Sequence, residues 1–300
     1  MDSLPPSSGK LRPNLTGASE TLLAILAARA LDANSKRPIL GDAHATRIFQ
    51  RLDYDFSKLG VRPFKAAVLA LRARYLDRWV AAFLAQAQQQ HETVTVLHLA
   101  AGLDTRALRL QDQFRNTNDF SAEVVHWVDV ELPAVVDVRR RLRIPEPTGP
   151  AMRYELKAAD VSEENWLAKL GLPRYQRTFV VFEGLTMYLD PARGHALIRD
   201  LTDYFVAEGN QMAFDCIHST VVLLQKFEPI VRNTSSSFRW AINEPKELEA
   251  CHNGLQLREE ISAVDNPFIL ELSVLHRCLI WLISWIPGMK KLSRFVRYEW

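Results

Sequence analysis

A single glycine lies where a buried apolar stretch of the sequence turns into a helix. The stretch Val94–Leu99 runs directly into AAGLDTR at residues 100–106, with Gly102 at the expected turn. A glycine there lets a ligand approach the backbone closely. A dinucleotide site needs the fuller pattern G-x-G-x-x-G, because a pyrophosphate rests on bare amides at the helix N-terminus. One glycine of the three therefore favours a nucleoside without phosphates over NAD.

Acidic residues follow the next apolar stretches. Asp129 and Glu131 stand 27 and 29 residues past Gly102, where an acid accepts hydrogen bonds from both ribose hydroxyls. Asp160 follows the third stretch, where a carboxylate can meet an adenine amino group, and Glu183 follows the fourth. Each acid also has an ordinary structural role, because acids favour and cap helix starts. A glycine and carboxylates at four successive strand ends together favour a nucleoside site.

Candidates for metal or general-base chemistry are few. Cys216, Cys251 and Cys278 are far apart and odd in number, which fits free thiols and gives no metal-ligand spacing. His218, shortly after the fifth apolar stretch, and His44, in the N-terminal helical region, are the candidate bases. A structural role is the simpler interpretation of both histidines.

Composition excludes several classes of partner. The 300 residues are 48% hydrophobic and 24% charged, as in an ordinary globular chain, and the formal net charge is only +2. The longest late apolar run, Cys278–Pro287, is half the roughly 20 residues of a membrane span, and no secretory signal precedes the helical region. We therefore expect a cytoplasmic protein that binds a small molecule and neither nucleic acid nor membrane. The sequence does not indicate an oligomeric state.

The elements that would position these residues follow an alternating pattern. Short apolar runs separated by helical segments are typical of βαβ units and a mainly parallel, doubly wound α/β sheet. The predicted strands are Val94–Leu99, Val124–Val128, Met152–Leu156, Thr178–Phe182 and Gln211–Phe214. The predicted helices between them are Thr105–Phe114, Pro133–Leu142, Glu163–Leu170 and Pro191–Val206. Ligands of such sheets bind outside the carboxyl ends of the strands.

Two further regions flank this pattern. Residues 16–90 have apolar residues at spacings of three and four, with Pro63 at a helix start, and we expect a helical cap over the ligand sites. Residues 1–15 are expected to be a flexible N-terminus, and residues 91–300 the ligand-binding core with C-terminal additions to the acceptor site. Residues 294–300 are predicted to form a last edge strand.

Three segments, read together, resemble the leucine carboxyl methyltransferase family, including its polyketide-tailoring and bacterial members. They are LAAGLDTR at residues 99–106, VDVELP at residues 128–133 and FEGLTMYL at residues 182–189. The resemblance extends from about Leu22 to the C-terminus. It implies a class I methyltransferase fold with a mostly parallel seven-stranded sheet, S-adenosylmethionine as cofactor, and O-methylation, often of a carboxylate.

The resemblance also implies a set of cofactor-binding residues. They are Arg29, Arg72, Gly102, Asp129, Glu131, Asp160, Val161 and Glu183. Arg72 resembles the arginine that holds the methionine carboxylate, with Arg74 as its near rival, and Glu131 the ribose ligand with Asp129 beside it. The sequence departs from the family pattern in having Ala100 where a glycine often opens the loop, and Glu131 where an Asp is more usual.

The chemistry of methyl transfer narrows the acceptor. In an in-line displacement the enzyme mainly holds the nucleophile close to the methyl carbon and aligned with it. A carboxylate is already ionised at pH 7 and needs no base, whereas a phenol with a pKa of about 10 needs one. Because no metal-ligand cluster or evident base is present, we expect a carboxylate of a small metabolite to be converted into a methyl ester.

Other functions remain open at this point. A protein C-terminal carboxyl methyltransferase and a phenol O-methyltransferase share the implied fold and cofactor. An NAD-dependent enzyme shares the fold, although the single-glycine turn disfavours it. A catalytically altered protein that only binds a metabolite is the alternative outside methyl transfer.

Overall fold

The computed structural model describes residues 9–114, 125–149 and 151–300. The strands are β1 (Val94–Leu99), β2 (Val125–Glu131), β3 (Met152–Ala158), β4 (Thr178–Phe182), β5 (Gln211–Ile217), β6 (Gln256–Ser262) and β7 (Ser293–Glu299). β1 and β4 have the predicted bounds. β2, β3 and β5 extend further at their carboxyl ends than predicted. Val124, the predicted start of the second strand, lies outside the described residues.

Helices precede, separate and follow these strands. The α-helices are α1 (Ala18–Ala33), α2 (Ala43–Gln50), α3 (Pro63–Gln89), α4 (Arg106–Phe114), α5 (Pro133–Arg141), α6 (Trp166–Leu170), α7 (Pro191–Tyr204), α8 (Ser219–Leu224), α9 (Pro229–Asn233), α10 (Val274–Ser284) and α11 (Met289–Leu292). The short 3-10 helices are η1 (Phe56–Leu59), η2 (Thr186–Tyr188), η3 (Gln225–Phe227), η4 (Pro245–Cys251), η5 (Ala263–Asp265) and η6 (Pro267–Glu271).

The seven strands form one doubly wound sheet in the order β3-β2-β1-β4-β5-β7-β6. β1 to β5 are parallel, and β7 runs antiparallel to both β5 and β6. The order reverses between β1 and β4, which is the switch point where ligands of such sheets bind. The predicted α/β class and the mostly parallel seven-stranded sheet are confirmed.

The prediction that residues 294–300 form an edge strand is wrong. This segment forms β7, which is enclosed between β5 and β6, and the edge position belongs to β6. β6 reads QLREEIS, and its side chains alternate between exposed and half-buried. A charged, half-exposed strand has no apolar run to reveal it, whereas β7 is mostly buried because it is enclosed.

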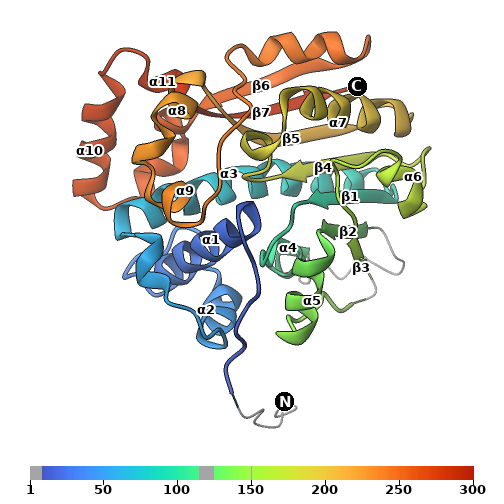
Figure 1. Cartoon of the computed structure of the whole chain (residues 1–300). Coiled ribbons are helices and arrows are strands. Elements are labelled where there is room, and N and C mark those ends of the chain that lie inside the picture. The colour runs from blue at the N-terminus through green and yellow to red at the C-terminus, as the bar shows by residue number, and fades with distance from the viewer. Residues whose placement is uncertain (1–8, 115–124, 150) are drawn as a thin grey trace.

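Helices cover both faces of the sheet (Figure 1). One face of β1, β2, β4 and β5 packs against α6 and α7, with Trp166 and Leu201 fully buried between the layers. The opposite face packs against the second half of α3 and against α4, through Trp79 and Phe83 of α3 among others. The second half of α3 therefore belongs to the layers of the core sheet.

The N-terminal helices form a separate cluster beside the sheet. α1 packs on α2 and on the first half of α3, and Leu23 and Leu26 are buried in this cluster. Pro63 occupies the first turn of α3, where its missing N–H is not needed. Leu11 pairs with Leu52 in an isolated parallel bridge, so the second half of the expected flexible segment 1–15 is held against α2. Residues 1–8 lie outside the described residues.

No helix in the described parts of the chain is both long enough and apolar enough to span a membrane.

Candidate active site

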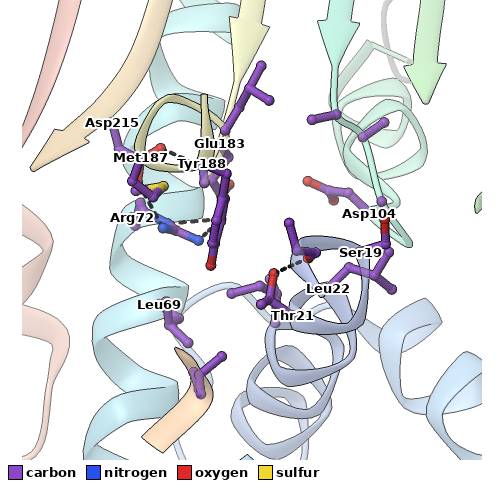
Figure 2. A pocket seen from close by; sticks show the side chains of 18 of the residues that line it. Ser19, Thr21, Leu22, Leu69, Arg72, Asp104, Glu183, Met187, Tyr188 and Asp215 are labelled. Carbon is purple, nitrogen blue, oxygen red and sulfur yellow. Dashed lines mark hydrogen bonds and ion pairs between the residues drawn. The ribbon is translucent and has the colours of Figure 1, made fainter. Parts of the chain in front are cut away.

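A cavity of about 560 Å³ opens at the carboxyl ends of β1, β2, β4 and β5. The loops that follow these strands form one side of it, and α1 and α3 form the other (Figure 2). Its volume lies in the ordinary range for small-molecule sites. This is the location that the doubly wound topology predicts.

The β1–α4 turn places backbone against this cavity. Ala100 and Gly102 both line it, and both have left-handed backbone, with φ of +49° and +53°. Such a conformation costs an alanine roughly 1 kcal/mol more than a glycine, which explains why a glycine is usual at position 100. A Cβ on Gly102 would lie 3.5 Å from the Cβ of Leu22 on α1. The turn therefore fits closely beneath α1.

The two acids after β2 have different environments. Glu131 lines the cavity, where its Oε1 accepts from the Gly102 N–H at 2.9 Å and its Oε2 from the Leu132 N–H at 2.6 Å. Burial raises the pKa of Glu131, although these two N–H groups oppose the shift. Each oxygen retains a lone pair, so the carboxylate can still accept hydrogen bonds from a ligand.

Asp129 does not line the cavity. It is 2% exposed, and its oxygens contact Nδ1 of His98 at 3.1 Å, the indole N–H of Trp127 at 2.8 Å and the guanidinium of Arg139 at 2.9 Å. The hydroxyl of Tyr154 also donates to Asp129. Its predicted place beside the ribose ligand is therefore not what the structure shows, because every direction around the carboxylate is taken by the protein.

The residues after β3 lie at the same end of the cavity as Glu131. Asp160 and Val161 both line it. The Oδ1 atom of Asp160 accepts from the N–H and the hydroxyl of Ser162, which fixes the carboxyl group in a turn. Its Oδ2 atom accepts no hydrogen bond within the described chain, so this oxygen remains available for a ligand.

Arg29, Arg72 and Glu183 meet at the opposite end of the cavity. Glu183, after β4, contacts Nη2 of Arg29 at 3.2 Å and Nη2 of Arg72 at 3.0 Å. Burial alone would raise the pKa of Glu183, but the charges of Arg72, Arg29 and Arg106 lower it to about 2. The structure thus brings together three of the predicted site residues, from α1, α3 and the β4 end.

Arg74 lies outside the cavity. Its guanidinium donates to the carbonyl oxygen of Ile39 and pairs with Glu271. Arg72 instead reaches the cavity, where its Nη1 pairs with Asp215 at 2.8 Å (Figure 2). Of the two rival arginines, only Arg72 is placed to contact a ligand.

A buried ion-pair network behind these residues escaped sequence analysis. Arg106 donates to Asp77 and, at 2.7 Å, to Glu183, and its side chain is fully buried. Arg109 pairs with Asp77 at 3.0 Å and with Asp104 at 2.8 Å. Asp77 comes from α3 and Arg106 from α4, so their partnership depends on a separation of 29 residues that no short motif reveals. The network fixes Glu183 and Asp104 at the cavity wall.

Asp104 is a second buried carboxylate in this wall. Burial would raise the pKa of Asp104, but Arg109, Arg29 and Arg106 hold it well below its usual value. Its Oδ1 contacts Arg29 at 2.6 Å, whereas its buried Oδ2 accepts no hydrogen bond from the described residues and lies 3.6 Å from Nη1 of Arg106. Asp104 thus places an ionised carboxylate, held by three arginines, in the wall of the cavity.

Asp215, at the end of β5, is a further residue that sequence analysis missed. Besides pairing with Arg72, it accepts from the Gly184 N–H at 2.6 Å. Gly184 has φ of +68°, and a Cβ there would lie 3.6 Å from Nη2 of Arg72. Asp215 therefore orients both Arg72 and the loop after β4. Its position at the end of the fifth apolar run was the available signal.

Neither candidate histidine lines the cavity. His218 caps α8, where its Nδ1 accepts from the Thr220 N–H, and His44 lies on α2. The histidine that does line the cavity is His98 on β1. Because Arg106 can only donate to its Nε2, at 2.9 Å, the His98 proton is on Nδ1 and points to Asp129. His98 thus links Arg106 to Asp129.

The remaining part of the cavity is mostly apolar. Its walls come from α1, α3, η2 and the segments after β5: Leu22, Ile25, Val68, Leu69, Met187, Val221, Ile230 and Phe238. The polar groups here include the hydroxyls of Ser19, Thr21 and Tyr188 and the Lys65–Glu228 ion pair at 2.9 Å. The Thr21 hydroxyl donates to the carbonyl oxygen of Ala18 at 2.6 Å. Burial raises the pKa of Tyr188, so its hydroxyl stays protonated at neutral pH.

Comparison with known proteins adds to this geometry. Residues 23–202 match the family described as leucine carboxyl methyltransferase. The tetracenomycin polyketide synthesis O-methyltransferase TcmP of Streptomyces glaucescens is 36% identical over 284 residues, covering 95% of this chain and 97% of that protein. The S-adenosyl-L-methionine-dependent methyltransferase dpfgK of Gibberella zeae is 33% identical over 263 residues, 84% of each chain.

Solved structures show a related fold. A DUF574 family protein from Streptomyces avermitilis superimposes with a TM-score of 0.56 at 14% sequence identity. The match covers 91% of this chain and 96% of that one. At this level of identity the likeness shows a shared fold.

Proposed function

Because this chain belongs to the leucine carboxyl methyltransferase family and is an S-adenosylmethionine-dependent methyltransferase, we propose that it methylates a carboxylate oxygen of a small metabolite to give a methyl ester. The proposed acceptor is a partly apolar secondary metabolite of the polyketide type. TcmP, which is named for polyketide synthesis, supports this class of acceptor. The choice of a carboxylate rests on one observation: the described proton acceptors of the cavity have lowered pKa values or are already engaged by other groups.

The polar groups of the cavity fit the cofactor. Glu131 offers carboxylate oxygens for ribose hydroxyls, and Asp160 a free oxygen for the adenine amino group. Arg72, beside Glu183 and Arg29, offers a cation for the methionine carboxylate, and Asp104, which lines the cavity, offers an anion for the ammonium group. When bound, S-adenosylmethionine supplies a methyl group on a positively charged sulfur.

The cavity lacks a good base among its described residues. Glu183 and Asp104 have lowered pKa values, and strongly acidic carboxyl groups are weak proton acceptors. Nε2 of His98 already accepts from Arg106, and Glu228 is paired with Lys65. Glu131 and Asp160 also line the cavity, but they are assigned to the ribose and the adenine, and Asp215 is paired with Arg72. A phenol would have to lose its proton to a group that is already engaged, whereas a carboxylic acid arrives ionised at pH 7. The site therefore suits a carboxylate better than a phenol.

The apolar part of the cavity would hold the acceptor. We assign Tyr188 as the donor that orients the acceptor carboxylate, because its protonated hydroxyl stands next to Thr21 among apolar side chains (Figure 2). A hydrogen bond to one carboxylate oxygen leaves the other free to act as the nucleophile. Lys65 adds a positive charge on the same side. Holding the nucleophile aligned is the main contribution an enzyme makes to such a displacement.

A matched pair of acceptors tests the proposal. The enzyme is supplied with S-adenosylmethionine carrying a labelled methyl group and with either 2-naphthoic acid or 2-naphthol, which differ in the oxygen group on one ring system. We expect label on the acid, and mild alkali should release it as methanol, because esters hydrolyse and ethers do not. Label on the naphthol that withstands alkali would contradict the proposal.

A variant links the result to the cavity. Tyr188→Phe removes one hydroxyl and should raise KM for the acid about 5- to 30-fold, since a hydrogen bond to a charged group contributes about 1 to 2 kcal/mol at a partly wet site. Binding of S-adenosylhomocysteine should be unchanged, because Tyr188 is assigned to the acceptor. An unchanged KM for the acid would remove Tyr188 from the proposed site.

A further inference from the structure

Helix α10 presents an apolar face to the outside of the molecule. Leu275 and Trp285 are 75% and 71% exposed, and Ile280 is the one residue of the helix that is buried. The exposed residues, here called the α10 face, are Val274, Leu275, Cys278, Leu279, Trp281, Leu282, Trp285 and Ile286. No described residue covers them, and Figure 1 shows α10 at the periphery, away from the sheet.

Helical geometry makes the α10 face one continuous surface. At 100° per residue the six positions of the face that lie within α10 fall in an arc of roughly 160°, and Ile280 lies on the opposite side. Trp285 and Ile286 follow the end of the helix and extend the exposed apolar surface along the chain. Ile280 packs with Ala67 and Leu71 of α3, so the inner side of α10 is already occupied. The arrangement reverses that of an ordinary surface helix, which keeps its polar side outward. The outward apolar side therefore lacks a partner within the described chain.

We propose that the α10 face joins two copies of this chain into a two-fold symmetric dimer. The exposed side chains of the face present on the order of 900 Å² of apolar surface, whereas a standard protein interface buries about 800 Å² on each partner. The largest apolar patch on a typical monomer is only about 300 to 600 Å². The α10 face is thus larger than an ordinary surface patch and comparable in area with one side of a standard interface.

The distribution of charge favours a second copy over a lipid surface. A two-fold axis brings a surface against itself, and the α10 face suits this because it contains no charged residue that would meet its own copy. Arg277 stands at its edge, and the nearby Lys290 and Lys291 are paired with Asp265 and Glu244. A helix that binds a membrane surface opposes its apolar side with a cationic side, whereas α10 opposes its own with the contact to α3.

Analytical ultracentrifugation of the full chain tests the dimer. We expect the wild-type protein to sediment at twice the mass of one chain at micromolar concentration. Leu282→Glu places a carboxylate in the middle of the face and should weaken association at least about 100-fold. Val206→Glu is the matched control, because Val206 is 48% exposed, beyond α7, against 58% for Leu282, and this variant should remain dimeric.

Two further measurements make the test decisive. S-adenosylhomocysteine should bind equally to wild type and Leu282→Glu, which shows that the monomeric variant is folded. Alkylation of the exposed Cys278 should be slow in the dimer and become faster on dilution or in Leu282→Glu. A wild-type protein that stays monomeric at 100-fold higher concentration, a Leu282→Glu dimer, or a monomer that sediments with phosphatidylcholine–phosphatidylglycerol vesicles would overturn the proposal.

Discussion

Replacement of Arg72 by methionine separates cofactor binding from the stability of the site. Arg72 is 12% exposed at its side chain and pairs with Glu183 at 3.0 Å and with Asp215 at 2.8 Å. Arg74, two residues further along α3, is 33% exposed and pairs with Glu271 away from the cavity. Arg72→Met and Arg74→Met thus remove the same group from one helix, once inside the site and once outside it.

The expected magnitudes follow from these surroundings. If Arg72 holds the methionine carboxylate, its loss removes a charge-assisted bond of roughly 1.5 to 3 kcal/mol, or about 10- to 150-fold in affinity. The unfolding free energy should also fall, by about 3 kcal/mol, because Asp215 loses its charged partner while Glu183 keeps Arg29 and Arg106. Arg74→Met should change either quantity by less than about 1 kcal/mol, as expected for an exposed pair.

Titration calorimetry with S-adenosylhomocysteine and urea unfolding measure the two quantities separately. The calorimetry is performed at a temperature where circular dichroism shows each variant fully folded, so instability cannot appear as weak binding. Arg72→Lys should recover part of the affinity, since it keeps the charge but not the forked geometry. Equal and small affinity losses for Arg72→Met and Arg74→Met would refute the assignment of Arg72 to the cofactor.

Three other predictions follow from the same geometry. Glu131→Gln should weaken binding of S-adenosylhomocysteine and lower the unfolding free energy by only about 1 to 2 kcal/mol, because its amide nitrogen must face one backbone N–H. Asp129→Asn should leave binding nearly unchanged and lower the unfolding free energy by about 3 kcal/mol, because it disturbs a buried ion pair. Calorimetry and urea unfolding together check this contrast, and the reverse pattern would contradict it. The pKa of Glu183 is lowered from 4.5 to about 2, so the contribution of this carboxylate to stability is complete above pH 4.5 and is lost as the pH falls toward 2. The unfolding free energy of Glu183→Gln, measured by urea unfolding, should therefore vary less over this pH range than that of wild type. Parallel pH profiles of the two proteins would count against the ion-pair network. Gly194→Ala should lower the melting temperature, because the added Cβ would lie 2.2 Å from the buried ring of Trp240. This overpacking costs about 1 to 3 kcal/mol, which exceeds the helix preference of alanine over glycine. A raised melting temperature would show that the Trp240 ring can move aside.

The strands and turns that shape the site could be predicted because their signals are local. β1 and β4 are buried on both faces, so their sequences are mostly apolar runs with clear ends. The role of Gly102 could be predicted because it lies in the short turn between an apolar strand and the next helix. β6 was missed because it is an edge strand whose charged side chains face solvent, and this error also placed β7 at the edge.

The partners of the charged residues could not be predicted, since they depend on tertiary contacts. Asp129 and Glu131 both follow the glycine turn at suitable spacing. Glu131 is the last residue of β2, whereas Asp129 lies two residues before this end, opposite His98 of β1. Only the packing of Arg139 and Tyr154 around it shows that its carboxylate is engaged by the protein and does not line the cavity. Arg106 and Asp215 likewise gain their roles from contacts across different helices and strands.

The position of the transferred methyl group tests the central claim most directly. The enzyme is given S-adenosylmethionine with a carbon-13 methyl group and an acid acceptor, and the product is examined by long-range proton–carbon correlation NMR. A methyl ester predicts a correlation from the labelled methyl protons to a carbonyl carbon. A correlation to an aromatic or aliphatic carbon would show an ether or a carbon-linked methyl group and would contradict carboxylate methylation.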